Sequence, residues 1–145
     1  MNSTVVILCG GFGTRLRGVV PDRPKSMALI NNRPFLEYQV NWLRRQGVSD
    51  IILAVGFKAD DIEDYFADGL KYGVGIRYSH EKKPLGTGGA ILNAMRSYDL
   101  NDCVVINGDS FIDIDLLEFE RSYFSMNADL CMVCHYVKRA DRYGV

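Results

Sequence analysis

Short apolar runs alternate with helix-forming segments along the whole chain, and this alternation constrains the fold more than any other feature. The first run, residues 5–9, has no polar interruption and ends at Gly10 and Gly11, as a strand buried on both faces does. Alternating strands and helices predict βαβ units around a parallel sheet. We therefore expect an α/β fold, a Rossmann-like three-layer sandwich with a mostly parallel central sheet, whose ligands bind beyond the carboxyl ends of the strands.

The boundaries of the expected elements follow from apolar periodicity and from turn residues. Further buried strands are expected over residues 51–55, 75–80, 103–106 and 129–137. Helices are expected over residues 34–46, 60–66, 87–98 and 116–124, and Gly47 is expected to end the first of them. Asn107-Gly108 could also form a hairpin turn, but Asp115 and Glu118 resemble a capping box, which favours a helix start soon afterwards.

The bulk composition excludes several classes of protein. The chain has 145 residues, of which 48% are hydrophobic and 24% charged, and its formal net charge is -1. These values are ordinary for one globular domain, and a general nucleic-acid binder would carry a basic excess. The first apolar run is too short, and lacks the basic lead-in, for a signal peptide or a membrane span. We expect a cytoplasmic domain with free cysteine thiols that binds neither nucleic acid nor membrane.

The segment that follows the first strand combines glycine with cationic side chains. Glycines permit unusual backbone dihedrals and leave N–H groups open to phosphate oxygens. Thr14 adds a hydroxyl and Arg15 a planar guanidinium that suits phosphate. From Arg15 to Lys25, four cations accompany the single carboxylate of Asp22. On these residues alone, phosphate binding competes with a tight turn that carries solvent-exposed arginines.

Two familiar phosphate motifs do not match this segment. The dinucleotide fingerprint requires a third glycine where this chain has Leu16. A P-loop requires Lys followed by Ser or Thr after its last glycine, whereas Val19 and Val20 follow Gly18. If the segment handles phosphate, it therefore does so in another way.

Taken together, these motifs resemble the signature of the sugar-1-phosphate nucleotidylyltransferases. That signature is a Gly-Gly-x-Gly-Thr-Arg-Leu stretch followed by Pro-Lys, which this chain has as residues 10–16 and 24–25. The resemblance continues through residues 34–38, 84–90 and 107–109, so it covers essentially the whole chain. Within the family, residues 107–115 and 141–144 are most similar to the D-glycero-D-manno-heptose 1-phosphate guanylyltransferases.

The resemblance implies an enzyme that transfers a nucleoside monophosphate to a sugar 1-phosphate and releases pyrophosphate. For the subgroup, the substrates would be GTP and D-glycero-D-manno-heptose 1-phosphate, and Mg²⁺ would be the cofactor. Catalysis would rest on positioning and charge stabilisation. Two alternatives remain open: the same chemistry on mannose 1-phosphate or another sugar phosphate with a different triphosphate, and a nucleotide-binding domain without turnover. A homodimer is a further expectation.

The resemblance also assigns roles to individual residues. Arg15 would bind the triphosphate and stabilise the leaving pyrophosphate, and Lys25 would contact the phosphates at the reacting centre. Asp109 would hold Mg²⁺, and Asn107 would contact the sugar phosphate. The family usually has proline after the lysine, whereas this chain has Ser26. The nucleotide-binding positions, on either side of the base, would be Gly10, Gly11, Gly13, Thr14, Gly86, Thr87 and Gly88.

The resemblance finally bears on domain organisation. Residues 1–145 would form the nucleotide-binding core of a nucleotidyltransferase domain. Family members continue with a Glu-Lys pair for the sugar phosphate and with a second metal-binding aspartate, and residues 141–145 have the character of mid-domain sequence. We therefore expect the C-terminal sugar-binding part to lie outside these residues, which would limit turnover by this chain alone.

Overall fold

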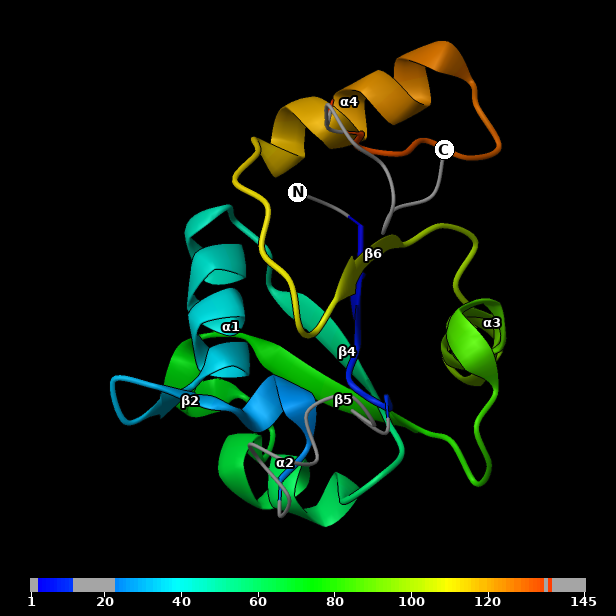
Figure 1. Cartoon of the computed structure of the whole chain (residues 1–145). Helices are drawn as coiled ribbons and strands as arrows, with labels where there is room; N and C mark the ends of the chain where they lie inside the picture. Colours follow the sequence, from blue (N-terminus) through cyan, green and yellow to red (C-terminus); the bar gives the residue numbers. More distant parts are fainter. Residues whose placement is uncertain (1–2, 12–22, 135, 137–145) are drawn as a thin grey trace.

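A four-stranded parallel sheet forms the centre of the protein, as a computed structural model shows for residues 3–11, 23–134 and 136 (Figure 1). Its strands lie in the order β5-β4-β1-β6, with the first strand of the chain inside the sheet. The strands are β1 (Val5–Leu8), β4 (Asp50–Val55), β5 (Gly75–His80) and β6 (Val104–Asn107). A separate antiparallel pair consists of β2 (Leu29–Ile30) and β3 (Arg33–Pro34).

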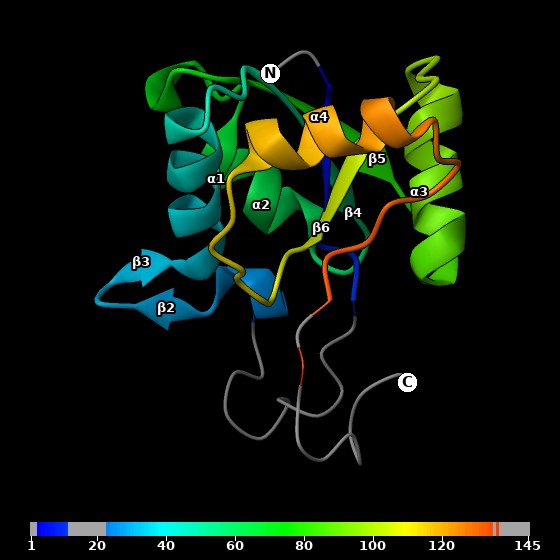
Figure 2. The same ribbon diagram turned by 90° about the horizontal axis from the view of Figure 1, so that it is seen from above.

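Helices cover both faces of the sheet, which makes three layers (Figure 2). Helices α1 (Phe35–Arg45) and α2 (Ala59–Phe66) lie on one face, and α3 (Gly86–Ser97) lies on the other. Helix α4 (Leu116–Met126) lies beyond β6, at the edge of the sheet (Figure 1). Two 3-10 helices, η1 (Lys25–Met27) and η2 (Leu70–Tyr72), complete the elements. The expected α/β class and parallel sheet are confirmed.

The core explains why the central strands read as continuous apolar runs. Successive side chains of a strand point to opposite faces, so Ile7 packs into the cluster beneath α1 and α2, whereas Val6 packs into the cluster beneath α3. Both side chains are fully buried. On the α3 side the helix contributes Ala90 and Ala94, whose small side chains permit close packing on the sheet.

Local signals fixed the ends of two helices as the sequence predicts. Gly47 has a φ of 83° directly after the C-cap of α1, and its N–H donates to the carbonyl of Arg44 at 3.0 Å. Val48 N–H donates to the carbonyl of Leu43, which completes a Schellman motif. At the start of α4, the Asp115 carboxylate accepts from the N–H of Glu118 at 2.9 Å, as expected of an N-cap.

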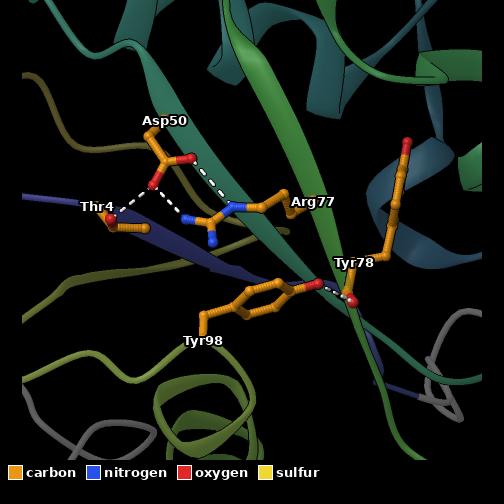
Figure 3. Close-up of polar contacts among 5 residues, drawn as sticks. All are labelled: Thr4, Asp50, Arg77, Tyr78 and Tyr98. Atoms are coloured by element: carbon orange, nitrogen blue, oxygen red, sulfur yellow. Dashed lines mark hydrogen bonds and ion pairs between the residues drawn. The ribbon is translucent and has the colours of Figure 1, made fainter.

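A polar cluster fastens the amino-terminal half of the sheet to the end of α3 (Figure 3). The Asp50 carboxylate accepts from the Thr4 hydroxyl at 2.6 Å and from the Arg77 guanidinium at 2.5 Å. The guanidinium lies over the ring of Tyr98, 4.3 Å from its centroid, and the Tyr98 hydroxyl donates to the carbonyl of Tyr78. This cluster lies away from the carboxyl ends of the strands.

The strand expected over residues 129–137 is wrong for the residues that the structure describes there. Residues 128–134 contain no strand, and Leu130 and Met132 are 78% and 70% exposed. An apolar run gives a segment the capacity to be buried, but a strand also needs a partner for its backbone groups. β6, the neighbouring edge strand, pairs with β1 alone among the described strands.

Candidate functional site

The order of the strands defines one special position in the sheet. From β1 the chain proceeds to β4 and then to β5 on one side, and it returns to place β6 on the other side of β1. The direction of winding therefore reverses between β1 and β6, and open parallel sheets bind ligands beyond the carboxyl ends of the strands at such a switch point. The segments that emerge there are residues 9–11 and 107–110.

The backbones of these two segments approach each other so closely that a side chain would not fit. Gly108 N–H donates to the carbonyl of Leu8 at 3.0 Å. A Cβ atom on Gly108 would lie 2.7 Å from that carbonyl oxygen and 3.1 Å from Sγ of Cys9. The glycine in Asn107-Gly108 thus permits a close contact between parallel strand ends, and the hairpin reading of this dipeptide does not apply.

Lys25 and Asp109 meet at this switch point. The Lys25 ammonium, at the start of η1, donates to the Asp109 carboxylate, and the two groups form an ion pair. Their side chains are 39% and 40% exposed, so both remain accessible to a ligand. The structure therefore brings together the predicted phosphate-binding lysine and the predicted metal-binding aspartate.

Asp109 is the one carboxylate among the predicted site residues, which makes it the candidate cation ligand. Within the described part of the chain, no group of three or more His, Cys, Asp or Glu side chains could hold a metal ion. Mg²⁺ does not need such a cage, because it is commonly bound through one or two carboxylates together with substrate phosphates and water. The single exposed carboxylate of Asp109, which already holds the cationic Lys25 ammonium, fits that mode of binding.

Cys9, at the end of β1, lies beneath this pair as a protonated thiol. Burial raises the pKa of Cys9 from its ordinary value of 9.0 to about 12; the neighbouring hydroxyl of Ser26 lowers it and the nearby Asp109 carboxylate raises it further. The thiol is therefore no nucleophile near neutral pH. Ser26, which replaces the proline usual in the family, is buried in the same place.

Glu81 connects the two glycine segments. A Cβ atom on Gly10 would lie only 2.4 Å from Oε1 of Glu81, so this carboxylate occupies the space that a side chain at position 10 would need. The other carboxylate oxygen, Oε2, accepts from the N–H of Leu85 at 3.0 Å. Leu85 is the residue before α3, which begins at Gly86 with a φ of 69°. Sequence reasoning missed Glu81, because its neighbours come from two distant segments.

The open surface beside this carboxylate is formed by glycine backbone. Gly11 and Gly88 are exposed, and a Cβ atom on either would meet nothing within 4 Å. Thr87 is also exposed, in the first turn of α3. These predicted nucleotide-binding positions therefore border free space, where N–H groups at the start of a helix can bind an anion or a polar ring.

Asn107 is placed differently from the other predicted residues. It is the last residue of β6 and is exposed, and its carbonyl oxygen accepts a hydrogen bond from Nε2 of the buried Gln39 at 2.8 Å. Gln39 also donates to the carbonyl of Ser110, so it holds both ends of the segment that carries Asp109. Gln39 was not among the residues predicted from the sequence. Gly13, Thr14 and Arg15, whose roles the resemblance implied, lie outside the described residues.

A parallel sheet with glycine backbone, an exposed lysine and a carboxylate at its switch point is an arrangement in which open α/β sheets can hold phosphate-bearing ligands. Comparison with known proteins gives the family. The sequence profile described as Nucleotidyl transferase matches residues 4–145. The chain belongs to this nucleotidyl transferase family.

Several relatives agree with this assignment. The chain is 44% identical over 139 residues, 96% of its length, to the D-glycero-alpha-D-manno-heptose 1-phosphate guanylyltransferase of Campylobacter jejuni. It is 36% identical, over 97% of its length, to a mannose-1-phosphate guanyltransferase of Yarrowia lipolytica. Among solved structures, HddC from Yersinia pseudotuberculosis in complex with GMP-PN matches with a TM-score of 0.75 and 41% identity, covering 83% of this chain.

The matches cover only part of each relative. The chain spans 60% of the length of the Campylobacter enzyme, 39% of the Yarrowia enzyme and 54% of the HddC chain.

Within the described residues, no helix is both long enough and apolar enough to cross a bilayer.

Proposed function

We propose that this domain binds GTP and takes part in the transfer of GMP to D-glycero-D-manno-heptose 1-phosphate. A phosphate oxygen of the sugar phosphate attacks the α-phosphorus, the bond between that phosphorus and the oxygen bridging to the β-phosphate breaks, and pyrophosphate leaves with the electron pair. The observation that carries the proposal is the Lys25–Asp109 pair at the switch point of the sheet, beside exposed glycine backbone. The names of the relatives that are 44% identical supply the sugar and the base.

Two anionic reactants that repel each other must come together in this reaction, and cations at the site would reduce that repulsion. The Lys25 ammonium is held at the carboxyl end of the sheet by Asp109 and can exchange this carboxylate for a phosphate oxygen when nucleotide binds. Asp109, released from Lys25, would hold Mg²⁺. When bound, the ion would neutralise charge on the phosphates and orient them. Arg15, by resemblance, would stabilise the leaving pyrophosphate.

Glu81 favours guanine as the base. An ionised carboxylate accepts hydrogen bonds but donates none, and it repels phosphate. The end of the site beside Gly10 therefore suits the base and not the triphosphate. Guanine presents two adjacent donors, N1–H and the 2-amino group, which a carboxylate can accept together. Uracil, cytosine and adenine lack such a pair of adjacent donors.

Mannose 1-phosphate is the second candidate for the sugar, because the Yarrowia relative that is 36% identical is named for it. Both candidates imply the same triphosphate site. We further propose that the domain acts in the cytosol, where phosphorylated sugars and GTP occur, and that it assembles as a homodimer. Binding of nucleotide without turnover is the remaining alternative for these residues alone.

The experiment that tests the proposal combines substrates systematically. The protein is incubated with Mg²⁺, heptose 1-phosphate or mannose 1-phosphate, and each nucleoside triphosphate in turn, and pyrophosphate release and nucleotide binding are measured. Pyrophosphate release with GTP and heptose 1-phosphate supports the proposal. Release with GTP and mannose 1-phosphate, but not with GTP and heptose 1-phosphate, supports the second candidate. Binding of GTP without release supports the domain without turnover. Absence of GTP binding contradicts all three.

A matched pair of nucleotides tests the role of Glu81. ITP has the structure of GTP without the 2-amino group, so it retains one of the two donors. We expect wild-type protein to prefer GTP over ITP, and the Glu81→Gln variant to lose that preference because its amide has a single acceptor oxygen. An unchanged preference in the variant would remove Glu81 from base recognition and would leave the triphosphate site intact.

A further inference from the structure

One stripe of helix α1, continued by its C-cap residue Gln46, contacts the connection between β6 and α4 at both ends. Gln39, Trp42 and Gln46 are spaced by three and four residues, so they share a face of the helix. The ring of Trp42 meets the ring of Phe111 edge to face, with centroids 5.3 Å apart. At the far end of the connection, Gln46 donates to the carbonyl of Ile114 at 3.2 Å and accepts from the N–H of Leu116 at 3.4 Å.

Gln39 holds the near end of this connection, at Asp109. Its Nε2 donates to the carbonyl of Asn107 at 2.8 Å and to the carbonyl of Ser110 at 2.7 Å, which lie on either side of the aspartate. Gln39 is 1% exposed, so these bonds form where water does not compete for them. An apolar side chain at this position would leave two carbonyls without their donor.

Helix α1 also supports the partner of Asp109. Lys25 begins η1, and the carbonyl of Ala28, directly after η1, accepts from the N–H of Phe35, the first residue of α1, at 2.9 Å. The helix is anchored independently of Gln39, because Leu36, Val40 and Leu43 are fully buried against the sheet. The hydrogen bonds of Gln39 therefore position the segment around Asp109 and are not needed to pack α1 on the sheet.

We propose that Gln39 is a positioning residue, which holds the Asn107–Ser110 segment so that the Asp109 carboxylate can take a divalent cation together with the nucleotide phosphates. This inference rests on the proposed function, because it concerns the same carboxylate. Gln46 lies seven residues after Gln39 and has the same side-chain amide, but it binds the other end of the connection. It therefore supplies a control within the same stripe.

The test measures GTP affinity by calorimetry, with Mg²⁺ and with EDTA, and Mn²⁺ binding by electron paramagnetic resonance in the presence of GTP. Gln39→Met keeps the length of the side chain and removes both donors. We expect this variant to lose the cation-dependent part of the GTP affinity by about tenfold to a hundredfold, the loss typical when the support of a metal ligand is removed. Its affinity in EDTA should stay close to that of the wild type, and Gln46→Met should retain both affinities.

A second variant tests the hydrogen bonds themselves and does not depend on how well Gln39→Met folds. In Gln39→Glu, an ionised carboxylate faces two carbonyl oxygens, whereas the protonated acid donates one hydrogen bond, and burial favours the protonated form. We expect the cation-dependent affinity of Gln39→Glu, relative to wild type, to recover as pH falls from about 8 to about 6. Gln39→Met should show no such recovery.

Three results would overturn the inference. The first is full cation-dependent affinity in Gln39→Met. The second is an equal loss in Gln39→Met and Gln46→Met, or an equal loss with and without the cation, since either would mean a general effect on folding. The third is a wild-type protein that binds GTP without any contribution from the cation. This third result would also contradict the metal-binding role of Asp109 in the proposed function. In that case, the Asp109→Asn variant would bind GTP as tightly as the wild type does.

Discussion

The Lys25 ammonium donates to the Asp109 carboxylate at the switch point of the sheet, although 84 residues separate the two in the sequence. Each side chain emerges from a different segment, Lys25 from η1 and Asp109 from the end of β6. A pair with both side chains about two-fifths exposed contributes little to stability. Its position beside the glycine segments therefore points to ligand binding.

The first prediction separates function from stability in this pair. Asp109→Asn should change the free energy of unfolding by less than about 1 kcal/mol, because exposed ion pairs are weak. It should lower the Mg²⁺-dependent affinity for GTP by about tenfold or more. Urea denaturation and calorimetry measure the two effects.

The pair of Asp50 and Arg77 is the matched control, since its side chains are 37% and 39% exposed and it lies at the other end of the sheet (Figure 3). Asp50→Asn should lower stability, because it also weakens the bond to Thr4, and should leave GTP affinity unchanged. Loss of GTP binding in Asp50→Asn but not in Asp109→Asn would reverse the assignment.

A second prediction concerns Gly88, whose replacement should improve stability and impair binding. Gly88 lies inside α3, its φ is not positive, and an added Cβ would meet nothing within 4 Å. Alanine is favoured over glycine in a helix by about 0.5–1 kcal/mol at interior positions and by less in the first turn, so Gly88→Ala should raise the melting temperature slightly. The same methyl group would stand where the nucleotide approaches the start of the helix, so GTP affinity should fall. A variant that is more stable and binds GTP normally would show that this surface is not used.

A third prediction concerns Gly108, where replacement should damage the fold itself. A Cβ atom there would lie 2.7 Å from the backbone oxygen of Leu8, and neither backbone can shift freely within the sheet. We expect Gly108→Ala to lower the free energy of unfolding by about 1–3 kcal/mol. Gly75→Ala is the control, because its Cβ would lie 3.6 Å from the carbonyl of Ser49, an ordinary contact. Equal destabilisation of both variants in urea would contradict the role of the close approach.

The sequence predicted the parts of the fold that local signals determine. The Schellman end of α1 at Gly47 and the N-cap of α4 at Asp115 depend on residues a few positions apart, and both expectations were confirmed. The family resemblance named Lys25 and Asp109 separately, but only the strand order brings them together.

Other features depended on distant partners and were missed. Gln39 holds carbonyls 68 and 71 residues away, and no short pattern records that relationship. Glu81 lies against Gly10, from which it is equally remote in the sequence. The strand expected at residues 129–137 is wrong for the part of that range that the structure describes. The hydrophobicity of Leu130 and Met132 indicated burial, but it did not identify a partner strand.

A fourth prediction follows from the buried thiol of Cys9. Its pKa is raised from 9.0 to about 12 in the folded protein, so above pH 9 the unfolded chain releases this proton more readily than the folded one. The folded state then binds more protons, and the free energy of unfolding must decrease as pH rises from about 9 towards about 12. The raised pKa values of Tyr65, which donates to the Glu37 carboxylate, and of the half-buried Tyr78 act in the same direction.

Cys9→Ala isolates the contribution of the thiol. Urea denaturation at several alkaline pH values should show a shallower loss of stability in this variant than in the wild type. Near neutral pH, Cys9 should resist alkylation in the native protein, because it is buried and protonated, whereas the exposed Cys134 should react. Rapid alkylation of native Cys9 would contradict the burial that underlies this prediction.

The most direct test of the account is to map where GTP binds. The ¹⁵N-labelled protein is titrated with Mg²⁺ and GTP while the chemical shifts of its backbone amides are recorded. We predict that the largest changes fall on Gly11, Gly88 and Asp109, around the switch point, while Arg77 in the polar cluster at the other end of the sheet stays unchanged. Changes centred on Arg77, or no saturable change at the switch point, would contradict the central claim that this end of the sheet binds the nucleotide.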